Sequence, residues 1–245
     1  MSDAKNVVII PAYNEESRIS AIIRRAASAA PDVDVVVIND GSSDRTADAA
    51  RDAGAVVLSH PFNMGYGVSL QTGYKYALNH DYGAVVQMDA DGQHDPVYIP
   101  QMLEALRVQK ADMVIGSRYT VKTGYKSTVV RRLGSAFFAL LATVITRSRI
   151  SDSTSGYKAI TKDVLPLLAS DAFPSDYPDA DLLVLLHHSH FTIKEMPMEM
   201  KQSDGKKSMH QGFVKNVYYV FKMCLSIMLN LIRKPVAGYR RKPCH

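Results

Sequence analysis

The chain has 245 residues, of which 47% are hydrophobic and 22% are charged. This composition is ordinary for a globular protein and excludes a largely disordered chain, and the length suits one substantial α/β domain. The formal net charge of +5 is modest. Five basic residues crowd the C-terminus, at positions 233, 234, 240, 241 and 242, without a nucleic-acid-binding motif, so we expect no nucleic acid as a partner.

The first half of the chain alternates short apolar runs with helical patterns. Each continuous apolar run is typical of a strand that is buried on both faces of a sheet. Strands are predicted at residues 7–10, 33–38, 55–58, 84–88 and 113–115. Helices are predicted between them at residues 16–29, 45–53, 65–79 and 96–109. This alternation predicts an α/β fold with a mostly parallel central sheet and helices on both faces.

The second half of the chain is less regular. Helices are predicted at residues 129–147, 161–169 and 181–188, a strand at 193–200 and a polar loop at 201–208. The sequence shows no internal repeat and no low-complexity linker. We therefore expect one main domain, residues 1–209, followed by a C-terminal appendage, residues 210–245.

The appendage contains an apolar helix from Phe213 to Ile232. At helical pitch its polar residues fall on one narrow stripe, formed by Lys215, Tyr219, Lys222, Ser226, Asn230 and Arg233. Polar residues interrupt the apolar run, so we do not expect a complete membrane span, which needs roughly 20 apolar residues. The pattern favours an amphipathic helix on a membrane surface, or one packed on a second copy or on a membrane-protein partner. A helix folded back on the main domain is the alternative.

The two ends of the chain bear on its location. No basic-then-apolar leader precedes the first strand, and the two cysteines, Cys224 and Cys244, cannot form a disulfide framework. These features predict a cytoplasmic protein. Basic residues crowd the last part of the sequence and favour anionic lipid as a partner, so we expect peripheral association with the inner face of the cell membrane. A solvated terminus without a partner is the alternative.

Two carboxylates, Asp89 and Asp91, directly follow the strand predicted at residues 84–88. In open α/β sheets, ligands bind beyond the carboxyl ends of the strands. An extended backbone points both side chains the same way, and their oxygens suit a Mg²⁺ or Mn²⁺ ion that bridges the two phosphates of a nucleotide donor. In isolation the Asp-x-Asp pattern does not distinguish a metal site from a structural role, in which Asp91 and Gly92 form a turn and Asp89 is a cap.

Polar clusters also follow the first two predicted strands, at residues 11–16 and 39–44. Tyr13 offers an aromatic face for stacking on a base, and Glu15 and Asp40 can accept hydrogen bonds from a base or ribose. The sequence has no Gly-x-Gly-x-x-Gly motif and no phosphate-loop lysine motif, which argues against a dinucleotide or ATP as the ligand.

In this order, the clusters resemble those of family 2 glycosyltransferases with the GT-A fold, and in particular dolichyl- or polyprenyl-phosphate sugar synthases. The resemblance covers residues 6 to 209 and rests on VIIPAYNE at 8–15, NDGSSD at 39–44, NMG at 63–65, DADGQHDP at 89–96, GSRY at 116–119 and DSTSGYK at 152–158. It implies a Rossmann-like GT-A fold for a catalytic domain formed by residues 1–209.

The resemblance also implies a role for each matched position. The nucleotide would be held by Pro11, Ala12, Tyr13, Asn14, Glu15, Asp40, Gly41, Ser42, Gly65, Met88, Asp89 and Ala90. The metal would be held by Asp89, Asp91 and Gln93. Arg118 and Arg131 would grip the acceptor phosphate, because guanidinium groups bind phosphate bidentately. For Arg131, the exposed start of a helix is the alternative.

Two further segments resemble those of the family but differ from it at individual residues. Asp181 follows a Tyr-Pro pair and would serve as a general base toward a sugar hydroxyl. Lys206, Lys207 and Ser208 lie in a loop that resembles the family's lid over the donor. Relatives usually have glutamate at Asp181, an arginine before the glycine of the lid and lysine at Tyr66, so these departures leave donor and acceptor identity open.

These features predict an inverting transferase that moves a hexose from a nucleotide sugar to undecaprenyl or dolichyl phosphate at the cytoplasmic face of the membrane. One alternative is transfer to a saccharide hydroxyl during polysaccharide synthesis, with Asp181 or Asp179 as the base. The other is a non-catalytic, nucleotide-sugar-binding subunit whose C-terminal helix docks on a membrane partner.

Overall fold

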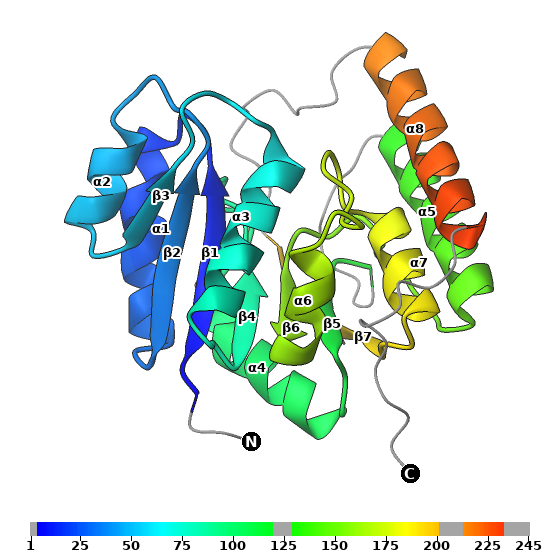
Figure 1. Cartoon of the computed structure of the whole chain (residues 1–245), viewed down its shortest axis with the longest axis horizontal. Helices are drawn as coiled ribbons and strands as arrows, with labels where there is room; N and C mark the ends of the chain where they lie inside the picture. Colours follow the sequence, from blue (N-terminus) through cyan, green and yellow to red (C-terminus); the bar gives the residue numbers. More distant parts are fainter. Residues whose placement is uncertain (1–3, 120–128, 201–212, 233–245) are drawn as a thin grey trace.

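The computed structural model describes residues 4–119, 129–200 and 213–232, and within them one sheet contains seven strands (Figure 1). The strands are β1 (Asn6–Ala12), β2 (Val33–Asn39), β3 (Val56–Ser59), β4 (Ala84–Gln87), β5 (Met113–Ser117), β6 (Lys158–Thr161) and β7 (Ile193–Pro197). Their order across the sheet is β3-β2-β1-β4-β6-β5-β7. The strands predicted in the first half all form, within one or two residues of their predicted ends.

Strand β6 runs antiparallel to both of its neighbours, whereas the other paired strands are parallel. Lys158 at the start of β6 therefore pairs with Gln87 at the end of β4 and with Ile115 in β5. As a result, the segment that enters β6 lies at the same edge of the sheet as the carboxyl ends of the parallel strands. The sequence did not predict this strand, because four residues are too few to show a period of two.

Helices cover both faces of the sheet, as predicted. The helices are α1 (Glu16–Ala29), α2 (Thr46–Asp52), α3 (Tyr66–Asn79), α4 (Ile99–Val108), α5 (Val129–Thr146), α6 (Leu165–Leu168), α7 (Ala180–His188) and α8 (Phe213–Ile232), with short 3₁₀ turns at Pro96–Tyr98 and Lys162–Val164. The helix predicted at 161–169 is thus split into the end of β6, a 3₁₀ turn and α6. Helices α1, α2 and α4 share one core cluster with the sheet, and α3, α5, α6, α7 and α8 share the other.

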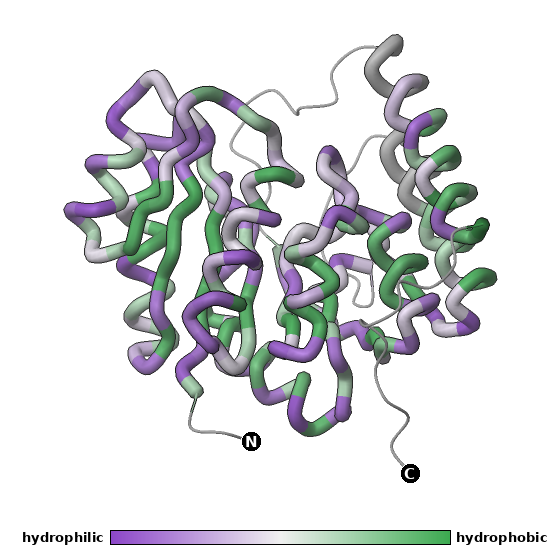
Figure 2. Tube along the Cα trace, viewed as in Figure 1, coloured by the Kyte–Doolittle hydropathy of each residue, from purple (hydrophilic) through white to green (hydrophobic). Residues whose placement is uncertain are grey.

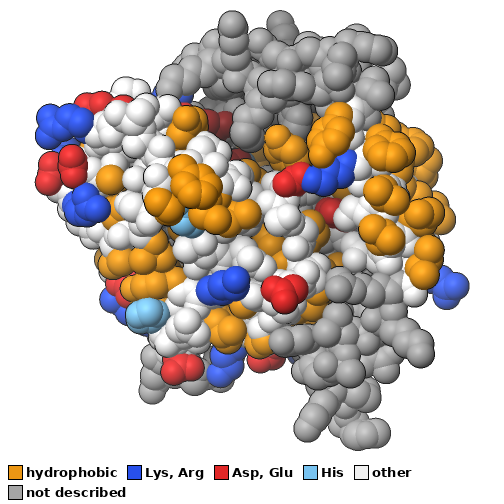
Figure 3. Space-filling view, turned by 45° about the horizontal axis from the view of Figure 1, so that its top comes forward, with side chains coloured by type: hydrophobic (Ala, Val, Ile, Leu, Met, Phe, Trp, Pro, Cys, Tyr) orange, Lys and Arg blue, Asp and Glu red, His pale blue; other side chains and the backbone are white. Residues whose placement is uncertain are grey.

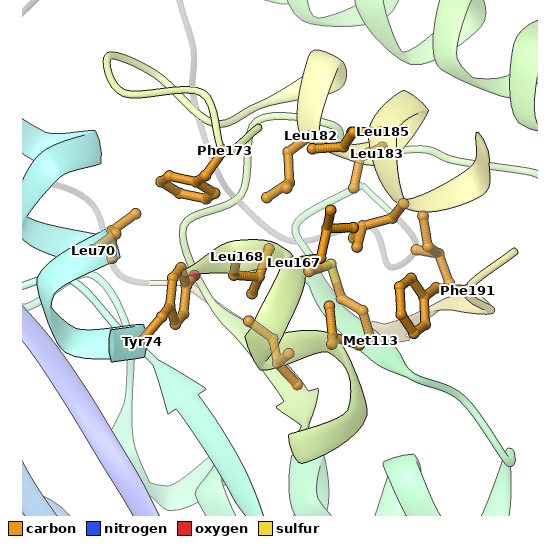
Figure 4. Close-up of a cluster of buried hydrophobic side chains, with 14 of the residues drawn as sticks. Leu70, Tyr74, Met113, Leu167, Leu168, Phe173, Leu182, Leu183, Leu185 and Phe191 are labelled. Carbon is orange, nitrogen blue, oxygen red and sulfur yellow. The ribbon is translucent and has the colours of Figure 1, made fainter. Parts of the chain in front are cut away.

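The burial pattern of α1 shows why the sequence forms this helix against the sheet. Ile19, Ile22, Ile23 and Ala26 are buried, and their spacing of three, one and three places them on one side of a helix. The other core cluster is larger and joins α3, α6 and α7, with residues such as Tyr74, Leu167, Leu168 and Leu183 pointing toward one another (Figure 4). A fully buried leucine or isoleucine contributes roughly 1.5–3 kcal/mol, so this packing fixes the elements that carry the site.

Helix α8 forms over the predicted range and lies beside α5 and α7, at the side of the molecule away from α2 (Figure 1). Met223 and Ile227 of α8 are buried in the larger core cluster. The ring of Tyr219 packs edge-on against Phe138 of α5, with ring centres 5.8 Å apart. Among the residues that the structure describes, none of the helices has the length and hydropathy needed to cross a membrane.

Candidate active site at the carboxyl edge of the sheet

The loops after β1 and β2 are joined by hydrogen bonds. The backbone N–H of Asn14 donates to Oγ of Ser42 at 3.0 Å, and Oδ1 of Asn14 accepts from the N–H of Ser43 at 2.9 Å. The N–H of Glu15 donates to Oγ1 of Thr46 at 2.8 Å. Asn14 has a left-handed backbone with a φ of 54°, which asparagine tolerates better than most residues. The two predicted nucleotide-binding clusters therefore form one surface.

This surface can contact a ligand through an exposed side chain and through exposed backbone. Tyr13 is 48% exposed, so its ring is open to a ligand. Ala12, Met88 and Ala90 are buried in the core cluster beneath the loops, so only their backbone is available at the edge of the sheet. Pro11 is likewise buried. The structure brings these predicted residues together, and their contact with a nucleotide stays a prediction.

Asp40 holds the turn that leads into α3. Its Oδ1 accepts hydrogen bonds from Nδ1 of His60 and from the N–H of Met64, both at 2.8 Å, and its Oδ2 accepts from the N–H of Gly65 at 2.9 Å. Asp40 is only 4% exposed. The neighbouring Gly41 lies so close to this turn that a Cβ atom would come within 2.3 Å of the backbone of Phe62. Asp40 therefore fixes the turn before α3, and its direct contact with a base or ribose stays a prediction.

Asp89 is fixed from three sides. The hydroxyl of Tyr66 donates to its Oδ1 at 2.8 Å, and its backbone N–H donates to Nδ1 of His94 at 2.9 Å. On the third side the backbone of Gly156 lies against the carboxylate, and a Cβ atom there would come within 2.5 Å of Oδ2. The carboxylate of Asp89 thus has one fixed orientation at the end of β4.

Asp91 is oriented by Gln93. The backbone N–H of Gln93 donates to Oδ1 of Asp91 at 2.9 Å, and its side-chain Nε2 donates to Oδ2 at 2.7 Å. Gln93 was predicted as a metal ligand together with the two aspartates. In the structure its amide nitrogen faces Asp91, so its observed contact is with the carboxylate, and metal ligation by Gln93 stays a prediction.

The two carboxylates form a cluster of negative charge. Burial raises the pKa of Asp89, although 29% of its side chain remains exposed, and the hydrogen bond from Tyr66 and the charges of Lys158 and Arg118 oppose this shift. Burial also raises the pKa of Asp91, and the nearby charge of Asp89 raises it further. Both shifts disfavour the doubly ionised pair, so a bound cation would stabilise it.

The aromatic side chains around the pair are neutral. Burial lowers the pKa of His94 to about 4, and its Nδ1 accepts the hydrogen bond from Asp89, so at neutral pH the ring carries its proton on Nε2. Burial raises the pKa of Tyr66 well above its usual value, so its hydroxyl keeps the proton that it donates to Asp89. Neither side chain offsets the negative charge of Asp89 and Asp91.

The two carboxylates suit a Mg²⁺ or Mn²⁺ ion that shares its ligands with a substrate, rather than a metal whose ligands all come from the protein. Across residues 4–119, 129–200 and 213–232, no group of three or more His, Cys, Asp or Glu side chains is arranged to hold a metal. Magnesium is usually bound through one or two carboxylates, with substrate phosphates and water completing the shell. Asp89 and Asp91 provide this donor set, and a divalent cation would neutralise their charge.

Arg118 is buried at the end of β5 in an ion pair. Its Nε and Nη2 each donate to the carboxylate of Asp152 at 2.7 Å, and Nη2 also donates to Oγ1 of Thr154 at 2.8 Å. Its predicted contact with an acceptor phosphate stays a prediction, and the observed role is to anchor the segment that leads to Gly156. The side chain of Arg131 and the lid residues Lys206, Lys207 and Ser208 lie outside the described residues.

Asp181 lies at the start of α7 and is 3% exposed. Its Oδ1 accepts from the N–H groups of Asp179 and Leu182 at 3.1 and 2.8 Å, and its Oδ2 accepts from Oγ of Ser226 at 2.6 Å. Burial raises the pKa of Asp181 to about 6. These contacts bind the carboxylate to α7 and α8, so the general-base role expected from the sequence stays a prediction that the hydrogen bonding does not favour.

Lys158 is a site residue for which the sequence predicted no role. It is 2% exposed, and its Nζ donates to the backbone O of Pro178 at 3.0 Å. Burial lowers its pKa, whereas the charges of Asp179, Asp89 and other nearby carboxylates raise it. The sequence motif around Lys158 was recognised, but nothing in a linear pattern indicates that this lysine is buried among acidic side chains.

Comparison with known proteins gives a consistent picture. A family model described as glycosyl transferase family 2 matches residues 7–167. The undecaprenyl-phosphate mannosyltransferase of Micrococcus luteus is 35% identical over 177 residues, which cover 69% of this chain and 71% of that protein. The polyprenol monophosphomannose synthase of Mycolicibacterium smegmatis is 30% identical over 82% of this chain and 78% of its own length.

Solved structures resemble the fold. Glucosyl-3-phosphoglycerate synthase from Mycobacterium tuberculosis, in complex with Mn²⁺ and UDP-glucose, superposes with a TM-score of 0.68 over 96% of this chain and 82% of that chain. The two sequences are 19% identical. At this identity the similarity establishes a common fold only. Which ligands the present chain binds must be inferred from its own site residues.

Proposed function

The chain belongs to glycosyl transferase family 2, and on this basis we propose that it transfers a hexose from a nucleotide sugar to a polyprenyl phosphate. The observation that carries the proposal is the pair Asp89 and Asp91, two fixed carboxylates of raised pKa at the end of a central strand. Relatives named as undecaprenyl-phosphate and polyprenol-phosphate mannose transferases support the lipid acceptor. The catalytic domain comprises residues 1–209.

On the donor side, this chain's residues hold and orient the diphosphate. Asp89 and Asp91 would bind a Mg²⁺ or Mn²⁺ ion, which supplies positive charge to the leaving nucleoside diphosphate. Tyr66 and His94 keep Asp89 in place, and Gln93 keeps Asp91 in place. The exposed ring of Tyr13 stacks on the base.

On the acceptor side, a phosphate needs no general base, because its second pKa of about 6 leaves it largely ionised at neutral pH. Its oxygen attacks the anomeric carbon, a new carbon–oxygen bond forms, and the bond to the nucleoside diphosphate breaks with inversion. The binding of Asp181 to α8 fits this scheme, since the carboxylate is not required to remove a proton. Transfer to a saccharide hydroxyl would require such a base.

We further place the acceptor at a membrane surface that α5 and α8 contact. Most of the large hydrophobic side chains that are exposed within the described residues belong to these two helices: Phe137, Leu140, Val144, Tyr218, Val220, Phe221, Leu225, Met228, Leu229, Leu231 and Ile232. Figure 2 shows α8 as predominantly hydrophobic, and Figure 3 shows hydrophobic side chains gathered at that side of the molecule. Contiguous exposed apolar surface of this kind marks a protein or membrane interface.

The occupant we propose for this surface is the inner leaflet of the cell membrane. The sequence continues after α8 with Arg233 and Lys234 and then with Arg240, Arg241 and Lys242. Basic residues next to an apolar helix are attracted to anionic lipid, by about 1 kcal/mol for each charge near the surface. A polyprenyl chain is itself anchored in that leaflet.

The transfer reaction is tested directly with radiolabelled UDP-, GDP- and dTDP-hexoses, Mn²⁺ and vesicles that contain polyprenyl phosphate. We expect label in the organic phase, released by mild acid as free sugar. Label found only in water-soluble oligosaccharide would favour a saccharide acceptor, and absence of any transfer with every donor would contradict the catalytic proposal.

The membrane surface is tested by vesicle co-sedimentation. We expect the wild-type chain to bind vesicles with anionic lipid, and the Phe221→Glu/Leu229→Glu variant to lose at least about tenfold in binding, because charged side chains are costly in a lipid interface. Val108→Glu is the matched control, since Val108 is 64% exposed on α4. Equal binding by all three proteins, or a stable dimer that dissociates only in the α8 variant, would contradict a bilayer as the occupant.

A further inference from the structure

The polar stripe of α8 faces the protein. Tyr219 donates to Oδ2 of Asp179 and Ser226 donates to Oδ2 of Asp181, both at 2.6 Å. The Nδ2 of Asn230 donates to the backbone O of Asp181 at 3.2 Å. Between these, Lys222 pairs with Asp176. The donors are spaced by three or four residues along the helix, and all of their acceptors lie within residues 176–181.

This orientation is the reverse of that of an ordinary surface helix, which turns its polar side to water. Tyr219 is enclosed by aromatic rings, since Tyr177 and Phe138 each pack edge-on against it with ring centres 5.8 Å apart. The apolar residues on the opposite side of α8, such as Phe221 and Leu229, are the exposed ones. The polar side therefore recognises a specific segment of the main domain.

The same segment is held on its other side by elements of the site. The backbone N–H of Gly67, in the first turn of α3, donates to the backbone O of Asp176 at 3.0 Å. The approach is so close that a Cβ atom on Gly67 would lie 2.3 Å from the backbone O of Ser175. Lys158 at the start of β6 binds the backbone O of Pro178. Residues 175–181 thus lie between α8 and the carboxyl edge of the sheet.

The first turn of α3 leads directly to the proposed metal carboxylates. Tyr66 precedes Gly67, and its hydroxyl donates to Oδ1 of Asp89. A short chain of contacts therefore runs from Tyr219 through residues 175–181 and Gly67 to Tyr66 and Asp89. Each link is a hydrogen bond, a close backbone approach or the peptide bond between Tyr66 and Gly67.

We infer that Tyr219 and Ser226 of α8 are positioning residues of the donor site, which act by holding residues 175–181 against the first turn of α3. This inference rests on the proposed transfer reaction. It also gives the two sides of α8 different roles. The apolar side is proposed to contact the membrane, and the polar side holds residues 175–181 and so positions Tyr66 and Asp89. The acidic pair Asp179 and Asp181 then accepts the hydrogen bonds that hold α8 on the main domain.

The test compares the Tyr219→Phe/Ser226→Ala variant with Tyr82→Phe. This control also removes a tyrosine hydroxyl that donates to an aspartate, but its acceptor, Asp34, lies near the start of β2, at the opposite edge of the sheet. The assay runs at a temperature at which circular dichroism shows all three proteins folded. We expect kcat to fall about tenfold to a hundredfold in the first variant with unchanged vesicle binding, because small misplacements of reacting groups cost this much. Wild-type kcat in the first variant would overturn the inference.

A second measurement is independent of the acceptor. Hydrogen exchange of the Gly67 amide reports its bond to Asp176, and we expect exchange at least about tenfold faster in Tyr219→Phe/Ser226→Ala and unchanged in Tyr82→Phe. Unchanged exchange at Gly67 would overturn the inference even if wild-type transfer is observed. If the wild-type chain transfers no sugar to lipid phosphate, the proposed function fails by itself, and the Gly67 amide still decides whether α8 positions the first turn of α3.

The conservative variant Asp179→Asn completes the test, because its amide oxygen still accepts the hydroxyl of Tyr219. We expect it to keep kcat within about threefold of wild type, whereas Asp179→Ala should resemble the Tyr219→Phe/Ser226→Ala variant. Equal loss in Asp179→Asn and Asp179→Ala would show that the charge of Asp179, and not its bond to α8, matters, and would contradict the inference.

Discussion

The hydroxyl of Tyr66 donates a 2.8 Å hydrogen bond to Oδ1 of Asp89, and the hydroxyl oxygen itself accepts from Nε2 of Gln87 at 3.1 Å. Tyr66→Phe removes the donor to Asp89 and leaves Nε2 of Gln87 without this acceptor. A hydrogen bond to a charged group contributes about 1.5–3 kcal/mol. We expect kcat/KM for transfer to fall about tenfold and the thermal midpoint to fall by several degrees, measured by steady-state kinetics and calorimetry.

Tyr82 supplies the control for Tyr66→Phe, since Tyr82→Phe removes a hydroxyl that donates to Asp34 at 2.8 Å near the start of β2, at the edge of the sheet opposite the proposed donor site. It should lower the thermal midpoint as Tyr66→Phe does, and it should leave kcat/KM unchanged. A Tyr66→Phe variant with wild-type kcat/KM would show that Asp89 is oriented without this bond.

Gly156 permits the close approach of backbone to Asp89. In Gly156→Ala the new Cβ atom would meet Oδ2 at 2.5 Å, so the carboxylate must turn away. We expect at least about a hundredfold loss of transfer activity, because misplacement of a metal-binding carboxylate by about 1 Å costs this much. The affinity for Mn²⁺, measured by calorimetry with UDP present, should fall in parallel.

Gly54→Ala provides the control, because at Gly54 a replacement strains the backbone without causing a steric clash. Gly54 has a φ of +93°, and a Cβ atom added there would meet no other atom within 4 Å. Gly54→Ala should lower stability by about 1 kcal/mol without changing the activity of the folded protein. If Gly156→Ala loses no more activity than Gly54→Ala, the close approach to Asp89 has no role in catalysis.

The raised pKa of Asp181 predicts a pH dependence of stability. Burial raises this pKa from 3.8 to about 6, so between these values the folded chain holds a proton that the unfolded chain has lost. The free energy of unfolding therefore falls as pH rises through this window, by up to about 3 kcal/mol from this residue. Asp181→Asn removes this titratable group, so the variant should gain stability relative to wild type from pH 4 to pH 7.

Urea unfolding of both proteins at several pH values measures this difference. Asparagine at 181 keeps an acceptor for the N–H groups of Asp179 and Leu182, so the fold is retained. Parallel curves of stability against pH for the two proteins would contradict the assignment of the raised pKa to Asp181.

The elevated pKa values of Asp89 and Asp91 predict how metal binding depends on pH. Both carboxylates must be ionised to bind a cation, and burial raises both pKa values. We expect Mn²⁺ affinity to weaken as pH falls, starting at a higher pH than an ordinary aspartate with its pKa of about 3.9 would allow. Calorimetric titration with Mn²⁺ from pH 7.5 down to pH 4.5 tests this, and a constant affinity would contradict it.

The sequence predicted the sheet, most helices and the site edge because these depend on local patterns. Apolar runs bounded by polar clusters identify β1, β2 and β4, and the carboxyl ends of parallel strands always share one edge. The periodic polar stripe also predicted α8 with its observed bounds. Family membership followed from the order of the motifs, which the family match over residues 7–167 confirms.

The remaining features depend on contacts between distant residues. The buried position of Lys158 follows from the antiparallel pairing of β6, which four residues cannot reveal. The bonds of Asp181 to Ser226 and of Tyr66 to Asp89 join residues 45 and 23 positions apart. The stripe on α8 was visible in the sequence, but only packing shows that it faces residues 176–181 and not water.

The central claim is that Asp89 and Asp91 hold the metal for sugar transfer to a polyprenyl phosphate. The most direct measurement is Mn²⁺-dependent transfer of labelled hexose to vesicle-bound polyprenyl phosphate by wild type, Asp91→Asn and the control Asp48→Asn, which alters an exposed carboxylate on α2. We predict loss of transfer by about a thousandfold in Asp91→Asn, full activity in Asp48→Asn, and loss of wild-type activity on chelation that Mn²⁺ restores. Undiminished transfer by Asp91→Asn, or by wild type in excess chelator, would contradict the account.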